Sequence, residues 1–145
     1  MSILEQSQVY RPFKYPQFVE LTKTHEEIHW VGDEADLSED VQDWKTKLSA
    51  GEKEFVTQIL KLFTQSDVAV GDNYHNHLIP RVKNNEARVM LASFANREGE
   101  HQRAYSLLND TLGLPEEIYS EFLEYSEMAD KVDHMTENDS TTQSG

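Results

Sequence analysis

The feature that most constrains the fold is a run of positions spaced alternately by three and four residues: 91, 94, 98, 101, 105, 108 and 112. Such spacing places all of these side chains on one face of an α-helix. Four of the positions are Leu or Phe, but Glu98, His101 and Tyr105 interrupt the apolar stripe. Because the apolar members should face a core, the three polar side chains are expected to point inward with them.

A second helical stripe precedes this one and contains a similar anomaly. Its pattern begins after a capping box, Ser49 to Glu52, and continues to about His77. Its apolar and aromatic members are Val56, Ile59, Leu60, Phe63, Val70 and Tyr74. Asp67 occupies a position of this stripe where another hydrophobic residue is expected. Both long helices should therefore direct acidic side chains into the protein.

The segments before these helices contain an arm, a helix and an acidic loop. Residues 1–16 include Pro12 and Pro16 and are expected to form an extended arm, followed by a helix at about 17–29. Ser38 should cap a short helix that ends near Trp44.

Sequence breaks define the later helices. Pro80 is expected to end the first long helix, since proline cannot continue one. Asn84 or Asn85 should cap the second, which stops at Gly113. Pro115 then opens a further helix to about residue 131, with acidic residues in its first turn.

The whole pattern predicts an all-α fold with no strand. We expect an extended arm over 1–16, a helical part over 17–131 and a polar tail over 132–145. The helical part should be built on a long antiparallel helix pair.

The antiparallel arrangement brings the two anomalies to one level. Asp67 and Glu98 lie about fifteen residues on either side of the predicted turn. At ~1.5 Å per residue, both side chains should sit roughly 23 Å from the bend. We therefore expect Asp67, Glu98 and His101 to meet inside the helix pair.

A metal ion explains such a meeting of charges. A buried carboxylate costs several kcal/mol unless a partner compensates it, and a dication is such a partner. Glu-x-x-His on an inward helix face is how four-helix bundles chelate a carboxylate-bridged metal pair. The predicted metal ligands are Asp67, Glu98 and His101, which suit iron or manganese. Tyr105, one turn beyond His101, is either a core aromatic residue or a redox residue beside the metal.

Other histidines give weaker signals. Glu26 and His29 repeat the Glu-x-x-His spacing but have no facing acid, so a solvated helix face is expected. His75 and His77 do not share a helix face, and their place near a helix C-terminus indicates a structural role. No partner is apparent for His134.

Composition excludes several classes of function. A formal net charge of −14 argues against non-specific nucleic-acid binding, and the absence of cysteine excludes disulfides and thiolate ligands. No apolar run approaches the ~20 residues of a membrane span, and the start of the chain has no secretory pattern. A cytoplasmic location without membrane attachment is expected.

Two longer segments resemble the small, radical-storing subunit of class I ribonucleotide reductase. They are LSEDVQDWKTKLSAGEKEFVTQILKLFTQSD, which ends at Asp67, and EARVMLASFANREGEHQRAYSLL, which contains Glu98, His101 and Tyr105. The resemblance covers residues from about 12 to 135 and implies a ferritin-like helical bundle.

The resemblance also implies a role for each residue. Asp67, Glu98 and His101 would bind one metal of a di-iron centre, and Tyr105 would store the radical used in deoxyribonucleotide synthesis. Trp30 aligns with a tryptophan that relays an electron between the metal site and the surface. The implied partners are the large catalytic subunit and a second copy of the small subunit.

The family pattern requires a second ligand set, a Glu and another Glu-x-x-His, which does not follow in this sequence. The protein therefore resembles an N-terminal half that needs a complementing C-terminal fragment. The alternative is a ferroxidase or iron-storage protein in which two copies form a four-helix bundle, with six ligands related by two-fold symmetry. An inert scaffold is the third possibility.

Overall fold

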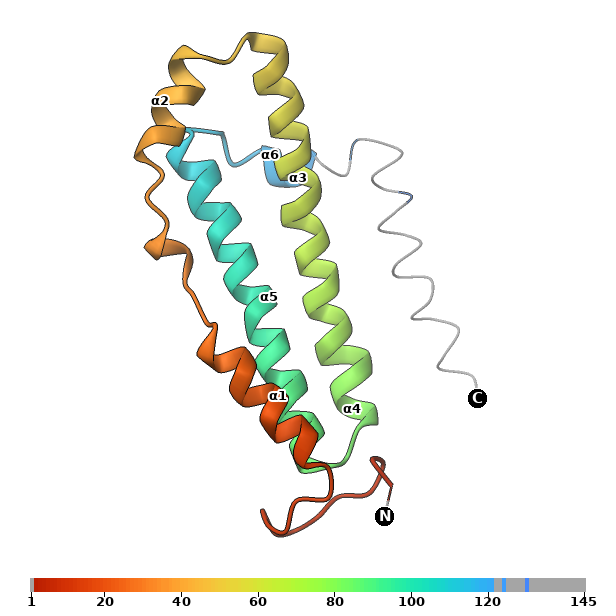
Figure 1. The fold of residues 1–145 in the computed structure, drawn as a ribbon. Helices are drawn as coiled ribbons and strands as arrows, with labels where there is room; N and C mark the ends of the chain where they lie inside the picture. The colour runs from red at the N-terminus through yellow and green to blue at the C-terminus, as the bar shows by residue number, and fades with distance from the viewer. Residues whose placement is uncertain (1, 122–123, 125–129, 131–145) are drawn as a thin grey trace.

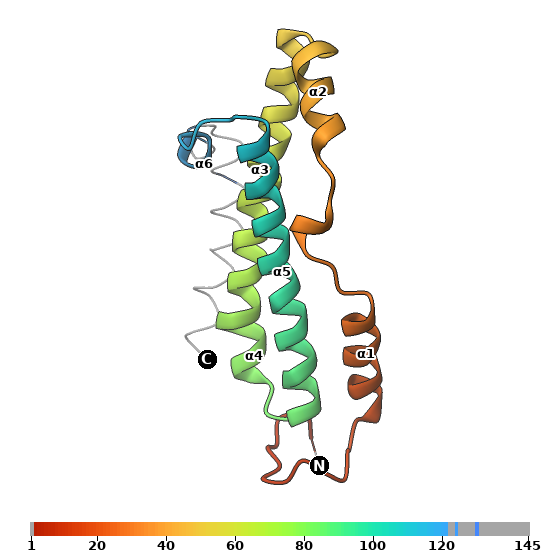
Figure 2. The same cartoon turned by 90° about the vertical axis from the view of Figure 1, so that its left-hand side faces the viewer.

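Two long antiparallel helices dominate the structure (Figure 1). The computed structural model describes residues 2–121, 124 and 130, and these residues contain no strand. Helices α3 (Ala50–Asn73) and α5 (Asn85–Thr111) form the pair, as the sequence predicted. Helix α1 (Pro16–Glu27) packs on the other side of α5, so that α5 lies between α1 and α3 (Figure 2).

The ends of the long helices follow from capping groups named in the sequence. Ser49 and Glu52 form the predicted capping box at the start of α3, with reciprocal hydrogen bonds between side chain and backbone. The side chain of Asn84 accepts a hydrogen bond from the backbone N–H of Ala87 at 3.0 Å and caps α5. Gly113 ends α5 with a φ of 74°, a left-handed conformation that favours glycine.

The predicted break at Pro80 is wrong. Helix α3 continues without a gap into a π-helical turn, η2 (Tyr74–Leu78), and then into α4 (Ile79–Arg81), which contains Pro80. Proline has no N–H and its ring crowds the carbonyl of the preceding turn, and the wider π turn accommodates both effects. The chain reverses only after Arg81, at the extended residue Val82.

Two smaller boundaries also differ from the prediction. Helix α1 ends at Glu27, and the loop after it contains a 3-10 turn, η1 (Gly32–Glu34). Ser38 is not the cap of α2 (Ser38–Thr46) but its first residue. Its N–H donates to the carboxylate of Asp36 at 3.0 Å, so an aspartate two residues earlier provides the capping interaction.

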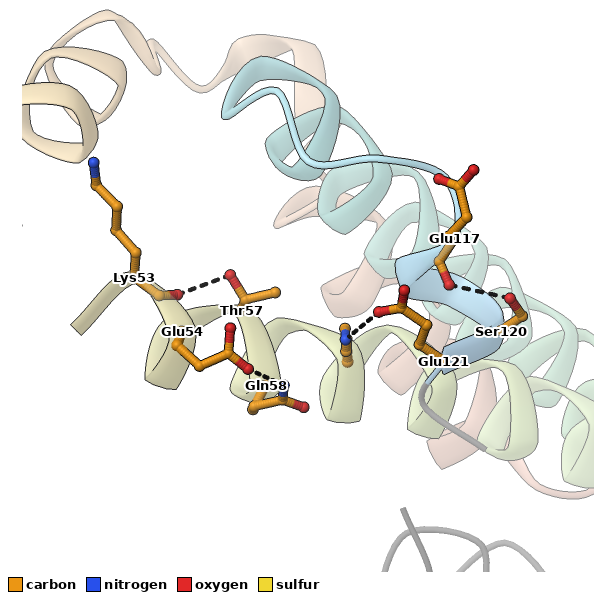
Figure 3. A network of polar contacts seen from close by, with 8 residues as sticks. Lys53, Glu54, Thr57, Gln58, Glu117, Ser120 and Glu121 are labelled. Atoms are coloured by element: carbon orange, nitrogen blue, oxygen red, sulfur yellow. Dashed lines mark hydrogen bonds and ion pairs between the residues drawn. The ribbon is translucent and has the colours of Figure 1, made fainter. Parts of the chain in front are cut away.

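Helix α6 (Ile118–Glu121) begins three residues after Pro115, because residues 115–117 form a turn. Its Glu121 carboxylate reaches across to α3 and pairs with Lys61 Nζ at 2.8 Å (Figure 3). The Lys61 side chain is buried, so this contact ties α6 to α3. The predicted end of the helix at Lys131 and the predicted tail over 132–145 lie outside the described residues.

The core lies along α5, but part of the α3 stripe does not face it. Leu60, Ala87, Ala95 and Ile118 are buried. Phe63 and Val70, which the stripe predicted to be inward, are 48% and 38% exposed. Among the described elements only α5, α6 and the η2 turn contact α3 substantially, so one of its apolar faces is uncovered.

Candidate metal centre

Asp67, Glu98 and His101 come together between α3 and α5, as their equal distance from the turn predicted. One ligand atom from each residue lies within 4.8 Å of the others. His101 Nδ1 and Glu98 Oε2, one helical turn apart on α5, are separated by 3.4 Å. Asp67 reaches the same point from α3, so two carboxylates and one imidazole converge.

The three side chains point between the helices, as the sequence predicted, but the cluster is only half-buried. The Glu98 side chain is 16% exposed and that of His101 is 36% exposed. Phe63, one turn before Asp67 on α3, is also partly exposed. The cluster is therefore accessible from one side.

Asp67 is the member of the cluster with an unsatisfied buried oxygen. Its Oδ2 atom is buried and has no hydrogen-bond partner among the residues that the structure describes. Burial raises the pKa of Asp67, the negative charge of Glu98 raises it further, and His101 acts in the opposite direction. A cation placed among the three side chains would satisfy Oδ2 and relieve the repulsion between the two carboxylates. The residues present thus fit a bound metal ion.

Two residues that the sequence did not single out determine how closely α3 and α5 approach each other beside Asp67. The Gln102 side-chain N–H donates to the backbone carbonyl of Asp67 at 3.2 Å. Gly71, one turn after Asp67, lies where an added Cβ would be 3.3 Å from Gln102 Nε2 and 3.8 Å from Glu98 Cβ. The sequence signals that could have indicated this close approach were a glycine one turn after Asp67 and a glutamine next to His101.

Tyr105 lies beside the cluster on α5. With Asp67 and His101 it lines a cavity of about 390 Å³. Burial raises the pKa of its phenol, and the charge of Asp67 raises it further. The ring of Phe63 stacks nearly parallel on that of Tyr105, with centroids 6.0 Å apart.

Trp30 lines the same cavity from the segment between α1 and η1. Its ring stacks on the imidazole of His101 at 6.0 Å between centroids, with 26° between the planes. The segment approaches α5 closely at Gly32, where an added Cβ would be 3.0 Å from the Cα of Ala104. Glycine at position 32 therefore allows Trp30 to reach His101.

The other sequence candidates do not form a comparable cluster. Within the part of the chain that the structure describes, Asp67, Glu98 and His101 are the only group of three possible ligands close enough to share a metal ion. Glu26 and His29 are exposed, in agreement with a solvated face. His75 is exposed and His77 half-buried in the π turn, and His134 lies outside the described residues.

A helix pair with two carboxylates and an imidazole between its members is typical of all-α proteins of the ferritin-like class. The family model "Ribonucleotide reductase, small chain" matches residues 7–144. The protein therefore belongs to the ribonucleotide reductase small-chain family.

Curated relatives agree with this assignment. The protein is 44% identical over 135 residues to the "Probable ribonucleoside-diphosphate reductase small subunit 376L" of Invertebrate iridescent virus 6, covering 93% of this sequence and 38% of that protein. It is 35% identical over 100 residues to the "Ribonucleoside-diphosphate reductase small subunit" of Dictyostelium discoideum, covering 69% of this sequence and 30% of that one. The sequence thus spans about a third of the length of these two relatives.

Solved structures support the ferritin-like fold. The Rnr4 homodimer of ribonucleotide reductase from Saccharomyces cerevisiae matches with a TM-score of 0.69 at 20% identity, over 84% of this chain and 44% of that one. An R2-like ligand-binding oxidase from Sulfolobus acidocaldarius matches with a TM-score of 0.61 at 23% identity, over 88% and 53% of the two chains. No helix among the described residues is long and apolar enough to span a membrane.

Proposed function

We propose that this protein supplies half of the ligands of a carboxylate-bridged di-metal centre in the small subunit of a ribonucleoside-diphosphate reductase. The observation that carries the proposal is the convergence of Asp67, Glu98 and His101, with ligand atoms within 4.8 Å of one another. Family membership adds support, because the matched residues include all three. The metal would be iron, or manganese, which accepts the same oxygen and nitrogen ligands.

Each ligand would have a distinct task. Asp67 would use the buried Oδ2 atom that has no other partner, and His101 would bind through one ring nitrogen. Glu98 would be the bridging carboxylate, as the family likeness implies, and its Oε2 atom lies 3.4 Å from His101 Nδ1. The remaining ligands would come from another polypeptide segment, which the family likeness assigns to a complementing C-terminal half.

Tyr105 is proposed as the residue that stores the radical. When bound, the metal centre would supply oxygen-dependent one-electron oxidation. Tyr105 would give up one electron to the metal centre and its phenolic proton to the neighbouring Asp67 carboxylate, whose charge acts on the phenol. Half-burial and the stacked ring of Phe63 would protect the resulting tyrosyl radical from water.

Trp30 is proposed as the electron relay between the site and the surface. Its contact with the His101 ring and its exposed fraction of 39% support this role, because one side of the indole meets a ligand while part of it meets solvent. The complete protein would work with the large catalytic subunit and as a homodimer, in the cytoplasm, in deoxyribonucleotide synthesis for DNA replication.

Electron paramagnetic resonance tests the proposal. The protein is mixed with a polypeptide that carries the missing Glu and Glu-x-x-His helices, and ferrous iron and oxygen are added. A tyrosyl radical signal is expected, and it should vanish in Tyr105→Phe. Absence of the signal in the wild-type mixture, with the fragments shown to associate, would count against the proposal. Binding of two irons per dimer with catalytic ferrous oxidation by the protein alone would instead favour the symmetric ferroxidase-like dimer.

A further inference from the structure

Arg97 is a buried cation directly before Glu98, and it contacts Trp30. Only 9% of Arg97 is exposed, although arginine normally keeps its guanidinium in water. Its guanidinium carbon lies 5.7 Å from the centre of the Trp30 ring, a cation–π distance. The same indole stacks on His101, four residues further along α5. Trp30 therefore lies over α5 against both a fixed cation and a candidate metal ligand.

The guanidinium is held in place by α1. Arg97 Nη2 lies 3.4 Å from each of two backbone carbonyls, those of His25 and Ile28, and donates to both. These carbonyls belong to the C-terminal end of α1, where the helix dipole favours a positive charge. The positive charge of Arg97 also affects its neighbour His25, whose pKa is lowered by burial and by Arg97. Arg97 thus links three elements: α1, α5 and the segment that contains Trp30.

We propose that Arg97 is a positioning residue for Trp30, which holds the indole against His101 and makes loss of an electron from the indole less favourable. Oxidation of Trp30 transfers one electron to the oxidant and leaves an indole radical cation. A neighbouring guanidinium attracts the electron-rich neutral ring and repels the radical cation. The electron-transfer part rests on the proposed function of Trp30 as a relay, whereas the positioning part does not.

The consequence is a minimum oxidant strength that is needed to remove an electron from Trp30. Trp30 would stay reduced in the presence of weak oxidants, despite its partial exposure, and would give its electron only to a strong one. Such a threshold would limit wasteful oxidation of the indole from solvent. Trp30 would then lose its electron only after the metal site has become a strong oxidant.

The test uses the metal-free protein, so it does not depend on assembly of the metal centre. Trp44→Phe makes Trp30 the single tryptophan. In this background, Arg97→Met removes the charge, Arg97→Lys keeps a charge, and Arg103→Met is the matched control. Arg103 lies on the same helix, 64% exposed at its side chain, and pairs with Glu100. Two quantities are measured: the fluorescence emission of Trp30, and the rate of indole radical formation with photogenerated tris-bipyridine ruthenium(III).

Arg97→Met should shift the Trp30 emission and accelerate indole oxidation by roughly threefold or more, as loss of a cation–π contact predicts. Arg97→Lys and Arg103→Met should stay close to the parent rate. Since ruthenium(III) is cationic, Arg103→Met reports how loss of a positive charge elsewhere on α5 changes the rate. If Arg97→Met loses helix content by circular dichroism, Arg97→Gln, which keeps an N–H donor without a charge, takes its place.

Equal emission and equal rates in the Arg97→Met and parent proteins would overturn the proposal, as would the same acceleration in Arg103→Met. Separately, a failure of the protein to yield a Tyr105 radical with its complementing segment would count against the proposed function without changing these results. The two failures are therefore distinguishable.

Discussion

The side-chain amide of Gln102 on α5 donates a hydrogen bond to the backbone carbonyl of Asp67 on α3, at 3.2 Å. This bond fixes the two helices relative to each other at the level of the proposed metal ligands. Gln102, which follows His101 in the sequence, thereby holds Asp67 at the position along α3 that is opposite Glu98 and His101. The bond links a candidate ligand on one helix to the backbone of a candidate ligand on the other.

Gln102→Ala should weaken metal binding more than it weakens the fold. Loss of one hydrogen bond should lower the free energy of unfolding by about 0.5–1.5 kcal/mol. Metal affinity should fall about tenfold, as is typical when a group that orients a ligand is removed. Metal titration and urea unfolding check both values. Asn96→Ala, at an exposed position on the same helix, is the control; it should leave metal affinity unchanged and should not lower stability, because alanine is the better helix former.

Gly32→Ala should displace the segment that contains Trp30. The new methyl group would lie 3.0 Å from the Cα of Ala104, a backbone atom that cannot move aside, so a loss of about 1–3 kcal/mol in stability is expected. Trp30 emission should change with it in the Trp44→Phe background.

Gly51→Ala is the matched control for Gly32→Ala. Nothing lies within 4 Å of the methyl group that it would add near the start of α3. The substitution should leave stability unchanged or raise it by up to about 1 kcal/mol, because alanine is the better helix former. Equal stability of Gly32→Ala and the parent would contradict the close approach of the segment to α5.

Glu86 should make the attachment of the N-terminal arm sensitive to acid. Its carboxylate accepts hydrogen bonds from the backbone N–H groups of Lys14 and Tyr15, at 2.7 and 3.4 Å, and from the Asn84 amide at 2.7 Å. Burial acts to raise the pKa of Glu86, but these hydrogen bonds and its own N–H outweigh it and hold the pKa below its ordinary value.

A lowered pKa stabilises the folded state above the ordinary value of 4.5 and loses this effect as the pH falls through the lowered value. Stability should therefore decline on acidification, and Glu86→Gln should reduce both the stability at neutral pH and its dependence on acid. Unfolding curves between neutral and strongly acidic pH measure this. Glu20→Gln, at an exposed position on α1, should retain the wild-type profile.

Local signals predicted most of the fold and the level of the site. Residues close in sequence determine where the long helices begin and end, so these boundaries do not depend on distant packing. Examples are the Ser49–Glu52 capping box, the Asn84 cap and Gly113. The equal distance of Asp67 and Glu98 from the turn survives the misplaced break at Pro80, because the π turn and α4 extend the helix without changing the pairing.

What the sequence could not predict depends on contacts between distant segments. The exposure of Phe63 depends on which faces of α3 are covered, and periodicity alone cannot report this. The contact of Trp30 with His101 depends on the close approach of Gly32 to Ala104. No sequence pattern singled out Arg97, and its burial follows from its contact with α1.

Anaerobic ferrous-iron titration of paired variants tests most directly whether the three converging side chains bind a metal ion. The sequence has two Glu-x-x-His pairs, and within the described part of the chain Glu98 and His101 are the pair that faces a third possible ligand. The wild-type protein and the Glu26→Gln/His29→Ala double variant are expected to bind about one ion each, with equal affinity, whereas Glu98→Gln/His101→Ala should bind none. Equal binding by both double variants, or loss of binding only in the Glu26/His29 variant, would contradict a metal site at Asp67, Glu98 and His101.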